Sequence, residues 1–125
     1  MDLTENKTQH PNSITLAENH LCQAAGKSHN QSIILPWDAA IESIEVKNVD
    51  QLDATLFQKL CNYQPEIIIL ATGESINYPD PDLLVPLVKN NIGLEVMTNS
   101  AAARTYNVLL AENRQVLCVF LINKD

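Results

Sequence analysis

A continuous apolar run in the second half of the chain most constrains the fold. Residues 66–71 read Glu-Ile-Ile-Ile-Leu-Ala, with Pro65 before the run and Gly73 shortly after it. A short apolar run bounded by turn residues is typical of a strand that is buried on both faces, as the strands of parallel sheets are. We therefore expect a central strand over 66–71 that other elements cover on both sides.

The segments around this run alternate between helical and strand patterns. Spacing of apolar residues predicts helices over 50–62, 79–91 and 101–112, and strands over 94–97 and 115–123. Asp50 is expected to cap the first helix, and Gly93 to end the second. Pro86 should weaken or kink that second helix. The alternation of helix and strand indicates an α/β fold with a mostly parallel sheet and right-handed crossovers.

Details of side-chain burial follow from the same spacing. In the second helix the buried side is predicted to consist of Leu84, Leu87 and Val88. Tyr106 in the third helix is expected to pack in the core rather than to act in catalysis. The third helix has a choice of N-cap residues, because Thr98, Asn99 and Ser100 precede it.

The first part of the chain has a different character. Residues 1–12 are polar and are expected to form a flexible tail, so that 13–125 make up a single domain. Short apolar pieces within 13–36 predict a small antiparallel β unit, with a hairpin turn at 25–27. Trp37 should fold back onto the core. Residues 41–46 mix helical and strand periods and remain ambiguous.

Composition excludes several classes of function. The chain has 15 acidic and 8 basic residues, a formal charge of −7, which disfavours binding to nucleic acid or anionic lipid. It has three glycines, too few at the required spacing for phosphate-binding or dinucleotide-binding loops. The three cysteines show no C-x-x-C spacing, and the polar N-terminus lacks a secretory signal. No apolar stretch is long enough to span a membrane. We therefore expect a cytoplasmic protein.

One edge of the predicted sheet is the candidate binding site. Parallel strands end at the same edge, so Thr72 and Gly73 should meet the N-terminus of the helix over 101–112. Their backbone N–H groups would receive an anion. Arg104 would fix its carboxylate or phosphate, Glu95 would orient Arg104, and Asn107 lies one helical turn away. Two interpretations without a ligand stay open. Gly73 could simply form the turn that ends the strand, and Arg104 could be exposed or could form a structural salt bridge.

No residue pattern assigns a reaction. His20 and Cys22 are too few for a zinc site, and the loop acids Glu74, Asp80 and Asp82 are more simply solvated, so neither a metal nor a cofactor is predicted. Ser75 and Ser100 have no evident base beside them, so catalytic residues stay unknown.

Residues from 65 to the C-terminus carry a resemblance to a known family. Three blocks carry it: Pro65–Gly73, Gly93–Met97 and Ala102–Leu109, the last including Arg-Thr-Tyr-Asn and followed by Glu112-Asn113-Arg114. The chain resembles the small uncharacterised α/β proteins that include a mitochondrial respiratory complex I assembly factor and an adipogenesis-associated protein. The family usually has Gly-Thr-Gly after the first strand and Asp-Thr after Val-Met, where this chain has Ala71 and Thr98-Asn99.

The resemblance implies a three-layer α/β sandwich, with a mixed, mostly parallel central sheet and an additional small N-terminal β layer. It also implies a binding or assembly-assisting module whose partner belongs to a respiratory or membrane complex. The alternative is a small-molecule site, enzymatic or not, for an anionic ligand near Thr72, Gly73 and Arg104. Whether the chain is an enzyme stays open at this point.

Overall fold

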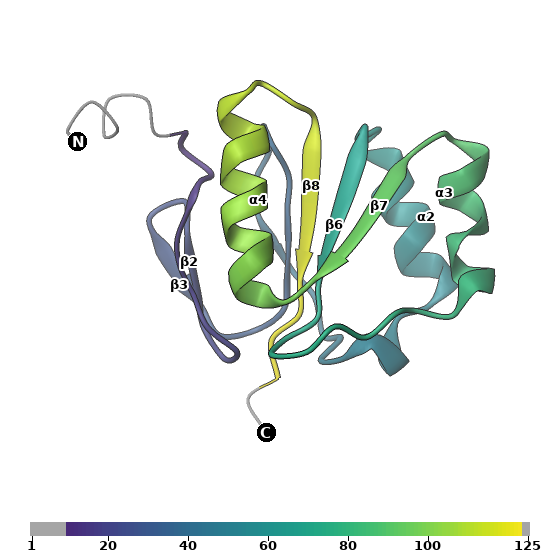
Figure 1. The fold of residues 1–125 in the computed structure, drawn as a ribbon, viewed down its shortest axis with the longest axis horizontal. Helices are drawn as coiled ribbons and strands as arrows, with labels where there is room; N and C mark the ends of the chain where they lie inside the picture. Colours follow the sequence, from purple (N-terminus) through teal and green to yellow (C-terminus); the bar gives the residue numbers. More distant parts are fainter. Residues whose placement is uncertain (1–9, 124–125) are drawn as a thin grey trace.

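Five strands form a central sheet in the order β5-β4-β8-β6-β7 (Figure 1). The structure, a computed structural model, describes residues 10–123. The strands are β4 (Ile33–Leu35), β5 (Glu42–Ser43), β6 (Ile67–Ala71), β7 (Gly93–Met97) and β8 (Val116–Phe120). β6 is parallel to both β7 and β8, and β4 runs antiparallel to β8 and β5. The prediction of a mixed α/β sheet with an apolar strand inside it is confirmed, and β8, β6 and β7 form its parallel part.

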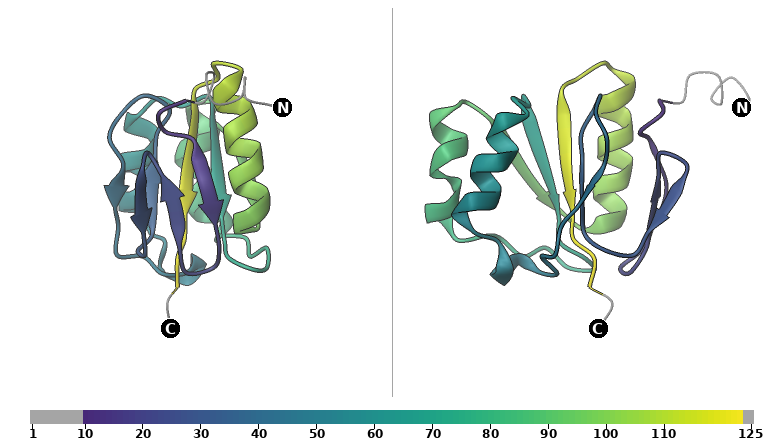
Figure 2. Two further views of the ribbon diagram at one scale, coloured as in Figure 1. Left: turned by 90° about the vertical axis from the view of Figure 1, so that its left-hand side faces the viewer. Right: turned by 180° about the vertical axis from the view of Figure 1, so that it is seen from behind.

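The two faces of this sheet are covered differently (Figures 1 and 2). Helices α2 (Ala54–Asn62) and α3 (Val85–Lys89) pack on one face. Helix α4 (Asn99–Ala111) packs on the other face, beside a small antiparallel sheet. That sheet consists of β1 (Ile14–Ala17), β2 (Cys22–Ala24) and β3 (Lys27–His29), in that order. The molecule is therefore an α/β structure with an additional small β unit, as predicted.

Helix starts follow the local sequence, with one correction. Asp53, and not Asp50, caps α2, because its side chain accepts a hydrogen bond from the N–H of Leu56. Asp50 instead lies in a short 3₁₀ helix, η1 (Val49–Gln51), where Asn48 accepts from its N–H. Thr98 caps α4 by accepting from the N–H of Ala101, as one of the three predicted candidates.

The segment before β7 departs from the predicted single helix. It divides into a 3₁₀ helix, η2 (Pro81–Leu84), and the short α3, with Pro86 in the first turn of α3, where a missing N–H costs little. Leu87 is buried but Val88 is 74% exposed, so the predicted buried side was wrong at Val88. Asn91 takes the left-handed backbone conformation after the helix, while Gly93 already belongs to β7.

The N-terminal segments are confirmed in outline and corrected in one strand. The hairpin turns at Ala25 and Gly26, which both have positive φ. Ile33–Leu35, predicted to belong to the small β unit, pairs instead with β8 in the central sheet. All three of its residues are buried, since a wholly apolar strand needs cover on both faces.

The residues before β1 and the two large aromatic side chains Trp37 and Tyr106 were also assigned from the sequence. Residues 1–9 of the predicted tail lie outside the described part of the chain, whereas the amide of Asn12 donates to the carbonyls of Pro36 and Ala39. Trp37 packs against both hydrophobic clusters, and Tyr106 is fully buried, both as expected.

We expect an acid-sensitive contact between β5 and α2. Lys59 and Tyr63 both donate to the carboxylate of Glu42, and the hydrogen bond from Lys59 is the main reason that the Glu42 pKa lies below its ordinary 4.5. Because the folded-state pKa is lowered, this stabilisation is present above pH 4.5 and is lost as pH falls through the folded-state pKa. For this largely exposed pair, Glu42→Gln should lower the free energy of unfolding by under about 1 kcal/mol at pH 7.

Urea denaturation of both proteins at pH 7 and pH 3 checks the expectation. The difference between wild type and Glu42→Gln should be smaller at pH 3 than at pH 7, because the wild-type carboxylate takes up protons as pH falls through its lowered pKa. An equal difference at both pH values would show that Glu42 acts through packing and not through its charge.

Candidate functional site

Asn99, the first residue of α4, closes the sheet edge where β6 and β8 end. Its side chain is buried, and its Oδ1 accepts from the N–H of Gly73 at 2.8 Å. Its Nδ2 donates to the carbonyl of Leu121 at 3.1 Å and to that of Glu18 at 3.4 Å. The backbone N–H of Asn99 also donates to the Gly73 carbonyl at 2.9 Å. One carboxamide thus connects α4 to three other segments of the chain.

The predicted backbone donors at this edge already have partners within the protein. The N–H of Thr72 donates to the Met97 carbonyl at 3.0 Å, and that of Gly73 donates to Asn99. The Thr72 hydroxyl donates to the carbonyl of Ser75 at 2.7 Å and accepts from the N–H of Asn77 at 3.2 Å. The structure brings Thr72 and Gly73 to the start of α4, as predicted, but their N–H groups hold the loop together there.

Arg104 and Asn107 lie apart from Gly73, in a depression of about 270 Å³ between α4 and β1. The Asn107 carboxamide accepts from the N–H of Ile14 at 2.8 Å and donates to its carbonyl at 2.7 Å, so it fastens β1 to α4. Arg104 is exposed on the same helix. Glu95 is exposed on β7, and within residues 10–123 no ion pair joins it to Arg104. Arg104 and Asn107 thus line one hollow, Gly73 lines another and Thr72 a third.

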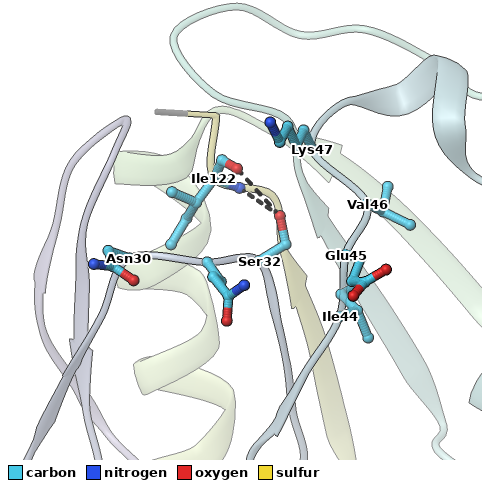
Figure 3. A pocket seen from close by; sticks show the side chains of 8 residues that line it. Asn30, Ser32, Ile44, Glu45, Val46, Lys47 and Ile122 are labelled. Atoms are coloured by element: carbon cyan, nitrogen blue, oxygen red, sulfur yellow. Dashed lines mark hydrogen bonds between the residues drawn. The ribbon is translucent and has the colours of Figure 1, made fainter. Parts of the chain in front are cut away.

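Two further hollows border the sheet edge where β6 and β8 end. One of about 490 Å³ lies between the turn after β1 and the start of α4, and Gly73, Asn99 and His20 are among its lining residues. The other, of about 340 Å³, lies beside Ser32 and Ile122, with Glu45 and Lys47 on its far side (Figure 3). The Ser32 hydroxyl accepts from the N–H of Ile122 at 2.8 Å and donates to its carbonyl. The Ser32 side chain, like that of Asn99, therefore binds the protein backbone.

The buried titratable groups stay neutral. Burial raises the pKa of the Cys22 thiol to about 12, and burial together with the nearby Cys22 raises the Cys118 pKa as well. Burial also raises the pKa of Tyr106, whose hydroxyl donates to the Pro36 carbonyl at 2.8 Å. A buried thiol with a raised pKa is a poor nucleophile. Among residues 10–123 no group of three His, Cys, Asp or Glu side chains is arranged to hold a metal ion.

Sequence reasoning missed the exposed apolar residues between β6 and β7. Six large hydrophobic side chains are exposed in the described part of the chain, and four belong to this one connection. We call these four the 76–88 surface residues: Ile76, Tyr78, Val85 and Val88. Tyr78 and Val88 are each 74% exposed. The spacing of Val85 and Val88 was the available signal, because residues three apart share one side of a helix.

Comparison with known proteins identifies the family. Residues 10–121 match the model of a family described as "Protein of unknown function (DUF498/DUF598)". The chain belongs to the DUF498 family. This confirms the resemblance that the blocks after Pro65 indicated, and extends it over most of the N-terminal half.

Two curated proteins of known name are relatives of this DUF498 chain. The "13 kDa major membrane protein" of Francisella tularensis is 32% identical over 81 residues, which are 65% of this chain and 59% of that protein. The "NADH dehydrogenase [ubiquinone] 1 alpha subcomplex assembly factor 3" of Drosophila melanogaster is 33% identical over 92 residues, 70% of this chain and 43% of that protein. The chain thus spans about half the length of these relatives.

A solved structure of a similar protein has the same fold. The NMR structure of a Xanthomonas campestris protein is 33% identical, with a TM-score of 0.82, and the match covers 98% of this chain and 92% of that one. In the DUF498 chain itself, no helix within residues 10–123 has the length and apolar character needed to cross a bilayer.

Proposed function

We propose that this DUF498 chain is a protein-binding module that assists the assembly of a multi-subunit membrane complex of the respiratory class. The observation that carries the proposal is the 76–88 surface: four of the six exposed large hydrophobic side chains lie along one connection. Exposed large apolar side chains are one mark of protein interaction sites, and tyrosine is enriched among the residues that dominate binding.

The names of the relatives support the same proposal. The Drosophila relative is named as an assembly factor of NADH dehydrogenase, and the Francisella relative as a major membrane protein. A module that docks on membrane-complex subunits would act beside the membrane without crossing it. The cytoplasmic location expected from the sequence is part of this proposal, and the three cysteines, which are free thiols, agree with it.

No specific observation favours the alternative of an anionic-ligand site. Such a site needs backbone N–H donors that are available, but those of Thr72 and Gly73 are used within the fold. Binding of an anion near Arg104 stays a prediction from the sequence.

Affinity capture from detergent-solubilised native membranes tests the proposed function. The tagged full chain should recover subunits of a respiratory complex, identified by mass spectrometry, well above a control that carries the tag alone. Recovery of no such subunit in repeated experiments would contradict the proposal.

A further inference from the structure

Strand β7 leaves one side of its backbone without hydrogen-bond partners. The N–H of Gly93 donates to the Glu66 carbonyl, and the Met97 carbonyl accepts from the N–H of Thr72, so the odd-numbered residues of β7 pair with β6. The backbone groups of Leu94 and Val96 therefore point away from β6. Within residues 10–123 no hydrogen bond to these four groups is found. β7 thus offers two N–H donors and two carbonyl acceptors along one edge.

The other sheet edges of the described chain are shorter or already covered. β5, at the opposite edge of the central sheet, has two residues, and its Glu42 is held by Lys59 and Tyr63. β1, at one edge of the small sheet, has the N–H and carbonyl of Ile14 occupied by Asn107. β3 has three residues. β7, with five residues, is the edge best able to accept another strand.

The charge of Glu95 favours a basic partner strand at this edge. Its side chain is exposed in the middle of β7, between the half-buried Leu94 and Val96. If two copies of the chain paired antiparallel about the middle of β7, two Glu95 carboxylates would face each other, and like charges directly opposite are destabilising. Residues 72–97 carry four carboxylates (Glu74, Asp80, Asp82 and Glu95) against one lysine, so their charge attracts a basic segment.

We infer that β7 takes an extended basic segment of a partner protein as a sixth strand of the central sheet. The inference rests on the proposed protein-binding function and names the kind of partner. Alternate side chains of the added strand would lie on opposite faces. Apolar residues would lie beside Leu94 and Val96 on the α3 face, and basic residues beside Glu95 on the α4 face. The main-chain hydrogen bonds would provide affinity and the alternating side chains specificity.

Titration of the ¹⁵N-labelled full chain with designed peptides tests the inference. The probe is an acetylated octapeptide of alternating lysine and valine. The amide signals of Leu94 and Val96 should shift saturably, and their hydrogen exchange should slow to a rate nearer that of Glu95, which already pairs with β6. A peptide of alternating glutamate and valine should bind at least about threefold more weakly, and added salt should narrow that difference.

Two controls separate strand addition from general attraction to an acidic protein. A lysine–valine peptide that is N-methylated at every residue keeps its charge but has no backbone N–H donors, and it should not slow exchange at β7. Glu95→Lys should reverse the preference between the two peptides, whereas Glu112→Lys, with the same change in net charge beyond α4, should preserve it.

The inference is overturned if the largest shifts lie outside β7, if the two unmethylated peptides bind equally, or if the N-methylated peptide slows exchange as the parent does. These results would leave the membrane capture experiment unaffected. Loss of capture together with a positive peptide titration would instead contradict the assembly role alone.

Discussion

Replacing Asn99 by alanine is expected to lower the free energy of unfolding by about 3 kcal/mol. The Asn99 side chain is 1% exposed and forms hydrogen bonds to Gly73, Leu121 and Glu18. Removing it leaves the buried Leu121 carbonyl and the partly buried Gly73 N–H without these partners, and each buried group without a partner costs about 1–3 kcal/mol. Urea denaturation monitored by circular dichroism measures the change.

Asn77→Ala is the matched control for this prediction. Asn77 lies on the same edge, in the exposed loop after β6, and its side-chain amide donates to Ser75 within that loop. We expect its substitution to change stability by less than about 0.5 kcal/mol. A loss below about 1 kcal/mol for Asn99→Ala would mean that water replaces the carboxamide easily, and that the edge is open to a ligand after all.

Combining Tyr78→Ser with Val88→Asp is expected to reduce capture of membrane-complex subunits by about tenfold or more. Truncation of a dominant interface residue typically costs at least about 2 kcal/mol of binding energy, which exceeds a factor of ten. Both side chains are 74% exposed, so the variant should fold normally. Quantitative mass spectrometry of material captured with equal amounts of each tagged protein gives the measurement.

Val108→Asp is the control for the surface variant. Val108 is 55% exposed on α4, the helix that covers the opposite face of the sheet from α3. The Val108→Asp substitution also places an aspartate at an exposed valine position, and it should leave the capture of membrane-complex subunits unchanged. Equal loss in both variants would assign the effect to added negative charge, and no loss in the double variant would exclude the 76–88 surface as the binding site.

Much of the fold could be predicted because the deciding signals are local. The apolar run of β6, the Thr98 cap of α4 and the hairpin turn at Gly26 each act within a few residues of sequence. β4 was misplaced because a three-residue apolar strand does not identify its partner. Its register, with Ile33 opposite Phe120, depends on residues almost ninety positions away.

The candidate site could be located but not interpreted from the sequence. Parallel topology correctly brought Gly73 to the start of α4. The role of Asn99 was missed because its partners, Glu18, Gly73 and Leu121, are distant in the chain. The spacing also placed Arg104 and Asn107 on one helix, but the packing of β1 against that helix decides what they contact.

The amount of assembled respiratory membrane complex in cells that lack this chain tests the assembly role most directly. Native gel electrophoresis of solubilised membranes should show less assembled complex in the deletion strain. Wild type and Val108→Asp should restore it, and the Tyr78→Ser/Val88→Asp variant should not. An unchanged amount of assembled complex in the deletion strain would contradict the account.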